Sequence, residues 1–291
     1  MMRPSRQHAL REGHWLALLG LGLMLLAGCQ AVFVPWDRFQ AQRESQGEAE
    51  PVLVRLATCW AGLPLAQELT TAFAQENPHL SVDVVSSTSG VVLAKVQAGE
   101  VDLSLVDQTW PPENLDRGLE ARILAWDGVG IVVAQGAALR ELTRQQLADL
   151  FAGHYLNWSE LGAGSGPPEL VVLAESAGPQ RAFQQAVMQG EKISSAAVVM
   201  PHERAVADYV ASHPRAVGIL SLGHQDGRLR WVAVDGILPT PATLRTGRYP
   251  LQYPLVLVRA QNLSAEALRF FAFATGAKGR RLIEQRYALP R

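Results

Sequence analysis

Beyond residue 50, short apolar runs alternate with longer segments whose apolar residues recur at helical spacing. The pattern predicts strands at residues 52–57, 80–85 and 101–106, with helices between them at residues 62–75 and 91–98. In the first helix, Leu65, Leu69 and Phe73 fall on one face. Because strands and helices alternate, we expect a parallel sheet with helices packed against it.

The second half of the chain repeats this alternation without a fixed short period, which argues against solenoids and propellers. The pattern predicts strands at residues 128–134, 170–173, 217–220 and 253–258, and helices at residues 143–151, 178–188, 203–212, 264–275 and 276–285. Thr143 and Ser264 are the expected N-caps of two of these helices, because a hydroxyl can accept a hydrogen bond from a free N–H group of the first turn. Two α/β units fit this pattern best.

The N-terminus has the features of an export signal. Arg3, Arg6 and Arg11 precede an apolar stretch at residues 15–27 that is too short to span a bilayer as a mature helix. The stretch ends in Leu-Ala-Gly-Cys, which resembles the lipobox of bacterial lipoproteins, with Cys29 as the acylated residue. The alternative is a secretory peptide with a chance cysteine. We therefore expect residues 1–29 to be a lipoprotein signal peptide and lipobox.

Composition narrows the class of protein further. Residues 30–50 are polar and Gln/Glu-rich without sustained periodicity, so we expect a flexible tether. If Cys29 is acylated, Cys59 has no intramolecular partner and a disulfide framework is excluded. Without residues 1–29 the net charge is −3, and no basic stripe is present, so nucleic acid is not an expected partner. Membrane contact is expected only through the lipid anchor.

Several segments resemble one family in order and spacing. They are Ser89-Gly90 with residues 98–103, residues 127–133, Leu142-Thr143, residues 151–153, Asn157-Trp158, residues 160–162, 218–223 and 247–251. Together they resemble the type 2 periplasmic binding proteins, and specifically the phosphate-binding subunit of ABC importers. The resemblance implies an α/β fold of two lobes, with mostly parallel sheets, helices on both faces and a cleft between the lobes.

The same resemblance implies the domain organisation and the partners. Lobe I would combine residues 51–135 with residues 230–291, and lobe II would be residues 136–229. The protein would be an extracytoplasmic subunit, lipid-anchored to the bacterial cell membrane, that hands a small, phosphate-like anionic solute to ABC permease subunits. We expect a monomer that has no enzymatic activity and needs no cofactor.

In this family the anion is held by hydroxyl groups and by backbone N–H groups at helix starts. In the first loop, Thr58, Cys59 and Trp60 replace a hydroxyl-rich run, and only Thr58 keeps a hydroxyl. Trp60 is either an aromatic wall of the ligand site or a ring packed between the lobes. Cys59 is expected to be a buried or cleft-lining thiol, because no base lies near it in sequence.

The second loop carries four hydroxyl groups at residues 86–89. Its candidate ligand residues are Ser87, Thr88, Ser89 and Gly90, which suit the capture of a polar or anionic ligand before a helix. A plain polar turn with a serine N-cap would have the same sequence. Of the three loops, this one keeps the family pattern best.

Asp107 ends the third predicted strand, where the family can place an aspartate that accepts a proton-bearing oxygen. A carboxylate there would reject a fully ionised oxyanion, because such an anion has no proton to donate. The alternative is an ordinary solvated aspartate at a strand end.

The third loop offers Ser176, Gly178, Gln180 and Arg181 as candidate ligand residues. The family usually has two arginines here, and in this chain Leu173 and Gln180 take their places. Arg181 comes one residue late, which rotates it by about 100 degrees on a helix. It either reaches the cleft or faces solvent.

No sequence motif for catalysis is present, and the seven histidines lack metal-ligand spacing. We therefore carry three hypotheses: a binding protein for phosphate or a related oxyanion, a receptor for an altered organic ligand, and a sensory or scaffolding lipoprotein without tight binding. Trp60 and the missing arginines motivate the second hypothesis.

Overall fold

The computed structural model of this chain describes residues 52–107 and 118–290, which belong to one compact unit. The predicted signal peptide, the lipobox with Cys29 and the tether lie outside the described residues. The described helices include none that is long and apolar enough to cross a membrane.

The first part of the unit, here called lobe I, follows the predicted alternation. It consists of β1 (Val52–Cys59), α3 (Leu63–Glu76), β2 (Leu80–Ser87), α4 (Ser89–Gln97) and β3 (Leu103–Val106). Strand β1 pairs in parallel with β2 on one side and β3 on the other, so the predicted parallel sheet is confirmed. Parallel strands end at one edge of a sheet, and this brings the first two predicted ligand loops and Asp107 together.

Helices cover both faces of this sheet. On one face Val92 and Val96 of α4 pack against Ala57 and Val106. On the other face α3 packs with the C-terminal helices α9 (Ala265–Thr275) and α10 (Ala277–Ile283). The ring of Phe73 meets that of Phe270 edge-on at 5.2 Å, an arrangement that aromatic rings favour.

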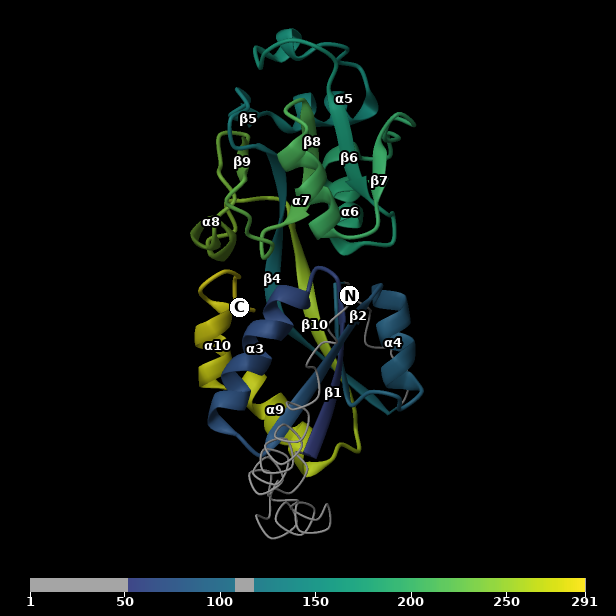
Figure 1. Ribbon diagram of the computed structural model, residues 1–291, viewed down its shortest axis with the longest axis vertical. Coiled ribbons are helices and arrows are strands. Elements are labelled where there is room, and N and C mark those ends of the chain that lie inside the picture. The colour runs from purple at the N-terminus through teal and green to yellow at the C-terminus, as the bar shows by residue number, and fades with distance from the viewer. Residues whose placement is uncertain (1–51, 108–117, 291) are drawn as a thin grey trace, which may run out of the picture. The chain divides into compact units, whose positions relative to one another are not determined.

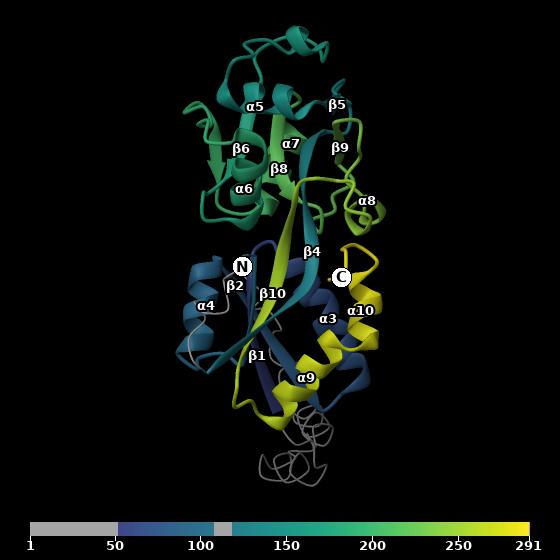
Figure 2. The ribbon, with the colours of Figure 1, turned by 180° about the vertical axis from the view of Figure 1, so that it is seen from behind.

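Two long strands connect lobe I to the rest of the unit. β4 (Leu119–Ala134) pairs antiparallel with β10 (Gln252–Ala260), and Figures 1 and 2 show the two strands side by side between the lobes. The sequence predicted only the buried end of β4. The other end was missed because residues 119–123 are partly or fully exposed and lack a continuous apolar run.

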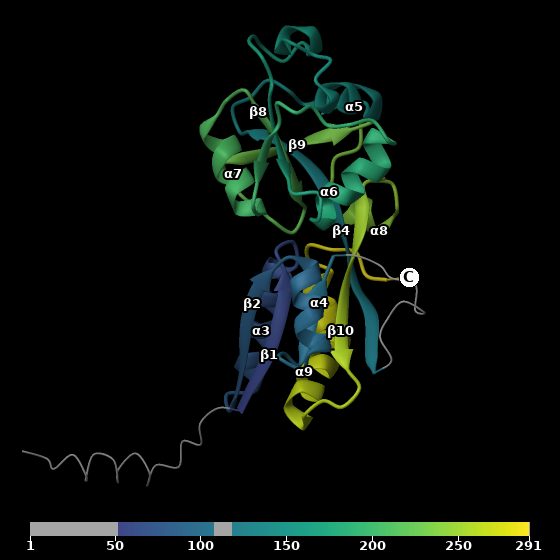
Figure 3. The same ribbon diagram turned by 90° about the vertical axis from the view of Figure 1, so that its right-hand side faces the viewer.

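The block between these two strands, here called lobe II, has its own sheet. Its elements are β5 (Glu141–Leu142), α5 (Arg144–Ala152), η2 (Trp158–Leu161), β6 (Glu169–Leu173), α6 (Gly178–Phe183), η3 (Gln184–Met188), β7 (Val198–Met200), α7 (Glu203–Ser212), β8 (Ala216–Ser221), β9 (Leu229–Val234) and α8 (Pro241–Arg245). Strand β8 pairs with the second half of β4, at Val129–Val133. Helices α6 and α7 lie on opposite sides of these strands (Figure 3).

Strand β9 also pairs with the second half of β4 and with β5. It therefore shares the sheet of the block that follows residue 135. The division of the chain into lobes at residue 230 stays a prediction. Across the whole unit the sheet order is β2-β1-β3-β10-β4-β8-β6-β7, which is the predicted α/β architecture.

Local capping chemistry fixes several helix starts. The Thr143 hydroxyl accepts a hydrogen bond from the Gln146 N–H at 3.1 Å, and the Gln146 side chain accepts from the Thr143 N–H. This reciprocal pair satisfies two N–H groups that the helix cannot satisfy itself. Ser264 caps α9 through the Ala267 N–H at 3.1 Å. Both predicted N-caps are confirmed.

Gly130 allows the ring of Trp231 to lie directly on β4. A Cβ atom at residue 130 would come within 2.2 Å of the Trp231 ring, so we predict that Gly130→Ala lowers the free energy of unfolding by about 1 to 3 kcal/mol through overpacking. Urea denaturation measures this loss. Gly136→Ala is the control, because no atom lies within 4 Å of its Cβ. Equal stability of the two variants would contradict the prediction.

Candidate functional site

Asp107 lies at the carboxyl end of β3 and is buried, with 5% of its surface exposed. The Ser89 hydroxyl donates to its Oδ1 atom at 2.6 Å, and the Asp107 N–H donates to the Ser89 oxygen at 3.1 Å. Ser89 is the first residue of α4 and is also buried. The solvated aspartate that the sequence left open is therefore not what the fold contains.

Lobe II supplies the other donors to the Asp107 carboxylate. The Gly178 N–H donates to Oδ2 at 2.9 Å, and an Arg181 guanidinium N–H donates to Oδ1 at 3.1 Å. The same Arg181 nitrogen also donates to the Asp107 carbonyl oxygen at 3.2 Å. Gly178 is essential to this approach, since a Cβ there would lie 2.4 Å from the Asp107 Cγ atom. One carboxylate thus collects a hydroxyl, an N–H group and a guanidinium from two lobes.

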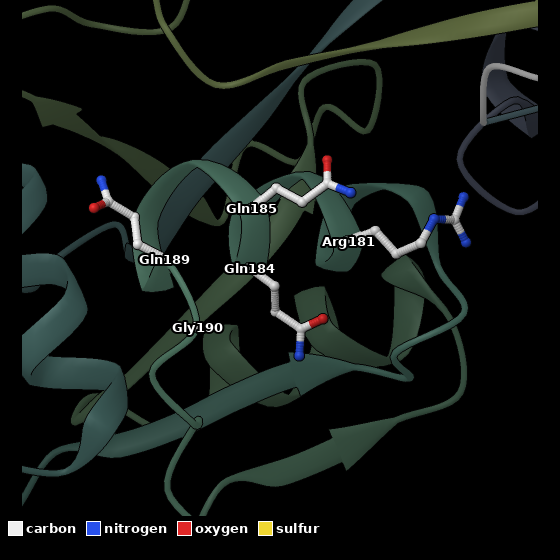
Figure 4. Close-up of a pocket in the computed structure, with 5 residues that line it drawn as sticks. All are labelled: Arg181, Gln184, Gln185, Gln189 and Gly190. Atoms are coloured by element: carbon white, nitrogen blue, oxygen red, sulfur yellow. The ribbon is translucent and has the colours of Figure 1, made fainter.

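Arg181 reaches lobe I although it comes one residue late in the sequence pattern. Its side chain is 29% exposed, and its guanidinium also donates to the carbonyl oxygen of Ser176. In Figure 4, Arg181 lies at the rim of an open pocket that Gln184, Gln185, Gln189 and Gly190 complete, and its guanidinium points away from Gln184 and Gln189. Its partial exposure limits the strength of the ion pair.

The polar groups of the first loop form hydrogen bonds within the loop itself. The Thr58 hydroxyl donates to the Cys59 carbonyl oxygen at 3.0 Å, and the Cys59 sulfur accepts from the Gly62 N–H at 3.3 Å. Cys59 is 1% exposed, and burial raises the pKa of its thiol well above the ordinary value. It is the buried thiol that the sequence favoured.

Trp60 contacts lobe II. Its ring lies 5.2 Å from that of His202, the N-cap residue of α7. Both rings stand between the first loop of lobe I and the start of a lobe II helix. The Trp60 ring is therefore packed between the lobes, which is one of the two alternatives that the sequence left open.

The remaining predicted residues divide into exposed and structural positions. Thr88 and Gly90 are exposed and Ser87 is half-buried, so within this loop only Ser89 contacts Asp107 through its side chain. Ser176 is exposed. Gln180 is 1% exposed, and its side-chain oxygen accepts from the Leu173 N–H at 3.2 Å, which braces the end of β6.

Asp127, which the sequence did not single out as a site residue, is fully buried in β4. The Tyr253 hydroxyl donates to its Oδ2 at 2.7 Å, while the N–H groups of Gly128 and Gly223 donate to its Oδ1 at 2.7 and 3.2 Å. Burial raises its pKa to about 7, and these donors oppose the rise. A charged residue inside an apolar strand was the signal that could have revealed it.

Glu203, the first residue of α7, is the second carboxyl group that the sequence reading missed. It is 4% exposed, and its Oε1 atom has no hydrogen-bond partner among residues 52–107 and 118–290. Burial raises its pKa to about 8, and the charges of Asp107 and Asp127 add to the rise. Its place directly after a short strand, beside His202, was the available signal.

The buried acids Asp107, Asp127 and Glu203 do not form a metal centre. Within the part of the chain that the structure describes, no three His, Cys, Asp or Glu side chains are arranged to hold a metal ion. The groups that converge on Asp107 are hydrogen-bond donors. Such a set suits the binding of a negatively charged oxygen.

Comparison with known proteins places this chain in a family. The sequence pattern of the PBP superfamily domain matches residues 44–278, which is most of the chain. The chain therefore belongs to the PBP superfamily.

A curated relative and a solved structure give more detail. The phosphate-binding protein PstS of Bacillus subtilis is 26% identical over 216 residues, which cover 71% of each chain. A Clostridium perfringens structure, described as a phosphate ABC transporter substrate-binding protein with bound phosphate, is 21% identical. It superimposes with a TM-score of 0.76 over 82% of this chain and all of that one. The resemblance and the fold class predicted from sequence are confirmed.

The same fold also occurs in a different class of protein. The reduced OxyR regulatory domain of Pseudomonas aeruginosa matches with a TM-score of 0.55 and 11% identity, over 78% of this chain and 98% of that domain. The fold alone therefore does not decide between transport and sensing.

The buried carboxyl groups generate a prediction about pH. In the unfolded chain Asp127 and Glu203 ionise near their ordinary pKa values, whereas the folded protein retains both protons up to about pH 7 and 8. Between these limits the folded state binds more protons, so stability falls as pH rises, by up to ~1.4 kcal/mol per pH unit for each group. We expect the melting temperature to be lower at pH 8 than at pH 5.

Asp127→Asn should make this slope shallower, because one of the two groups no longer titrates. Asp226→Asn is the control, because the hydrogen bond and charge of Arg228 lower the Asp226 pKa to about 2, below the tested range. Thermal melts of the three proteins at several pH values measure the slopes. An unchanged slope in Asp127→Asn would show that Asp127 is ionised in the folded protein throughout.

Proposed function

We propose that this protein is an extracytoplasmic solute-binding lipoprotein of an ABC importer, and that it captures phosphate or a related small oxyanion between its two lobes. The observation that carries the proposal is the donor set around Asp107. Ser89 of lobe I and Gly178 and Arg181 of lobe II all donate to one buried carboxylate. Donors that converge on a carboxylate oxygen can equally serve the oxygen of a solute anion.

Capture would proceed by exchange of these donors. When the lobes part, the bonds from Gly178 and Arg181 to Asp107 break, and these donors become available to the solute. The solute anion then accepts hydrogen bonds from Ser89, Gly178 and Arg181, while its proton-bearing oxygen donates to the Asp107 carboxylate. A fully ionised anion cannot make this last bond and would meet the carboxylate charge instead.

The relatives and the leader sequence support the remaining parts of the proposal. The similar proteins of Bacillus subtilis and Clostridium perfringens are named for phosphate, and a binding protein of an importer delivers its solute to permease subunits. An anchor at Cys29 with a tether at residues 30–50 would keep the domain close to a permease in the same membrane. We expect a monomer that binds its solute without chemical turnover.

A second candidate is a sensory or scaffolding lipoprotein that passes its closure to a partner. It is favoured by the fact that contacts within the protein already hold the lobes together, both at Asp107 and between Trp60 and His202. Closure stabilised in this way does not require a solute.

Isothermal titration calorimetry on the full chain in a mild detergent separates the two candidates. We expect saturable binding of phosphate, and Arg181→Gln should weaken it by about tenfold or more through the loss of a charged hydrogen-bond donor. Arg144→Gln, which removes a surface ion pair with Asp235, is the control. If phosphate, arsenate, sulfate and molybdate all give no heat, importer function for these anions is ruled out.

Asp107→Asn tests selectivity by protonation state. The asparagine amide can donate as well as accept, so the variant should bind sulfate better relative to phosphate than the native protein does. The ratio of the two dissociation constants, measured at one pH, should shift toward sulfate by about tenfold, the effect of one hydrogen bond to a charged group. An unchanged ratio would show that Asp107 does not discriminate between protonated and fully ionised anions.

A further inference from the structure

Glu203 has a polar atom that the protein leaves without a partner. Its Oε1 atom is buried and accepts no hydrogen bond from the described residues. A buried unpaired oxygen costs about 1 to 3 kcal/mol, so a fold that retains one without a use is disfavoured. Glu203 is not part of the donor set around Asp107, which leaves its role unexplained by oxyanion capture.

The position of Glu203 places this oxygen at the junction of the lobes. His202, the preceding residue, contacts Trp60 of lobe I. Trp60 follows β1 at the edge of the sheet where Asp107 follows the neighbouring parallel strand β3. Glu203 therefore faces the same region as Asp107 from the opposite lobe.

Two further unpaired groups occur in this region. Helix α7 packs against β8 and connects to it through only three residues, so the first residue of α7 lies at the end of β8 where Ser221 is found. The Ser221 hydroxyl is fully buried and has no partner among the described residues. The same is true of the Tyr287 hydroxyl, which lies against Gly223, the donor to Asp127. Buried polar groups that lack partners in the protein can be satisfied by a bound polar ligand or by water.

The charged groups at the junction indicate which kind of ligand would bind there. The charges of Asp107 and Asp127 raise the pKa of Glu203, and the Arg181 guanidinium contacts the Asp107 carboxylate. An inorganic oxyanion alone would add negative charge beside the Asp107 carboxylate and would leave the buried Glu203 oxygen without a donor. A ligand that also carries an ammonium group would instead bring the opposite charge and N–H donors for Glu203.

We propose that Glu203 is a specificity residue that binds the ammonium group of a zwitterionic organic oxyanion, an aminoalkyl phosphonate or phosphate ester. The phosphorus-bearing end of this ligand would occupy the donors Ser89, Gly178 and Arg181. Trp60 and His202 would enclose the carbon chain between the lobes. The inference rests on the proposed function, because it uses the same oxyanion donors.

Matched ligand pairs test this inference on the full chain. Calorimetry compares 2-aminoethylphosphonate with ethylphosphonate and 3-aminopropylphosphonate with propylphosphonate, so that each pair differs only in the amine. For at least one pair we expect the amine to raise the affinity of the native protein by about tenfold or more, as a buried charged hydrogen bond does. Glu203→Gln should reduce this ratio to about threefold or less, whereas Glu191→Gln, at an exposed carboxyl of lobe II, should preserve it.

The outcomes separate the two levels of the proposal. If inorganic phosphate binds but the amine gives no advantage in either pair, the ammonium site is wrong and oxyanion capture stands. An advantage that survives in Glu203→Gln would assign the ammonium to another group and also overturn the inference. If neither phosphate nor any phosphonate binds, the proposed function and the ammonium site both fail. The ratio in the native protein decides the first point even if the variant does not fold.

Discussion

A carboxylate taken out of water must be given hydrogen-bond donors, and this requirement shapes the centre of the molecule. Asp107 follows a parallel strand of lobe I, and among the described residues of that lobe Ser89 is the donor to its carboxylate. The missing donors come from lobe II, through Gly178 and Arg181. The carboxylate therefore links the two lobes, and removing donors from a buried charge costs more than the pair contributes in net terms.

The crossing strands make this arrangement possible and also reversible. β4 and β10 carry the chain between the lobes, and Asp127 ties them to the lobe II loop at Gly223. The contacts between the remaining loops include the polar set at Asp107, with Gly178, beside the aromatic contact of Trp60 with His202. Polar contacts of this kind can be exchanged for contacts to a solute at small net cost, whereas an apolar interface could not.

Two further acids, Asp127 and Glu203, are buried near the junction of the lobes. Burial disfavours the charged forms of Asp127 and Glu203 and raises their pKa values to about 7 and about 8, so both carboxyl groups are largely neutral below pH 7. Neutral carboxyl groups make the closed arrangement tolerable near Asp107. Glu203 also places a buried, unpaired hydrogen-bonding oxygen at the junction, which is the basis of the proposed ammonium site.

The sequence by itself determined the α/β alternation, the helix caps and the class of fold, because these follow from local periodicity and from side chains that bond to nearby backbone. It also predicted Ser89, Asp107 and Gly178 as neighbours of one site, through resemblance rather than spacing. It could not decide that Arg181 reaches Asp107, since that pair is 74 residues apart and depends on how the lobes meet. Asp127 and Glu203 carried only weak signals in the sequence, because their burial, and hence their raised pKa, exists only after distant strands and helices close around them. Burial and charge at a lobe junction are properties of tertiary packing, and local sequence does not encode them.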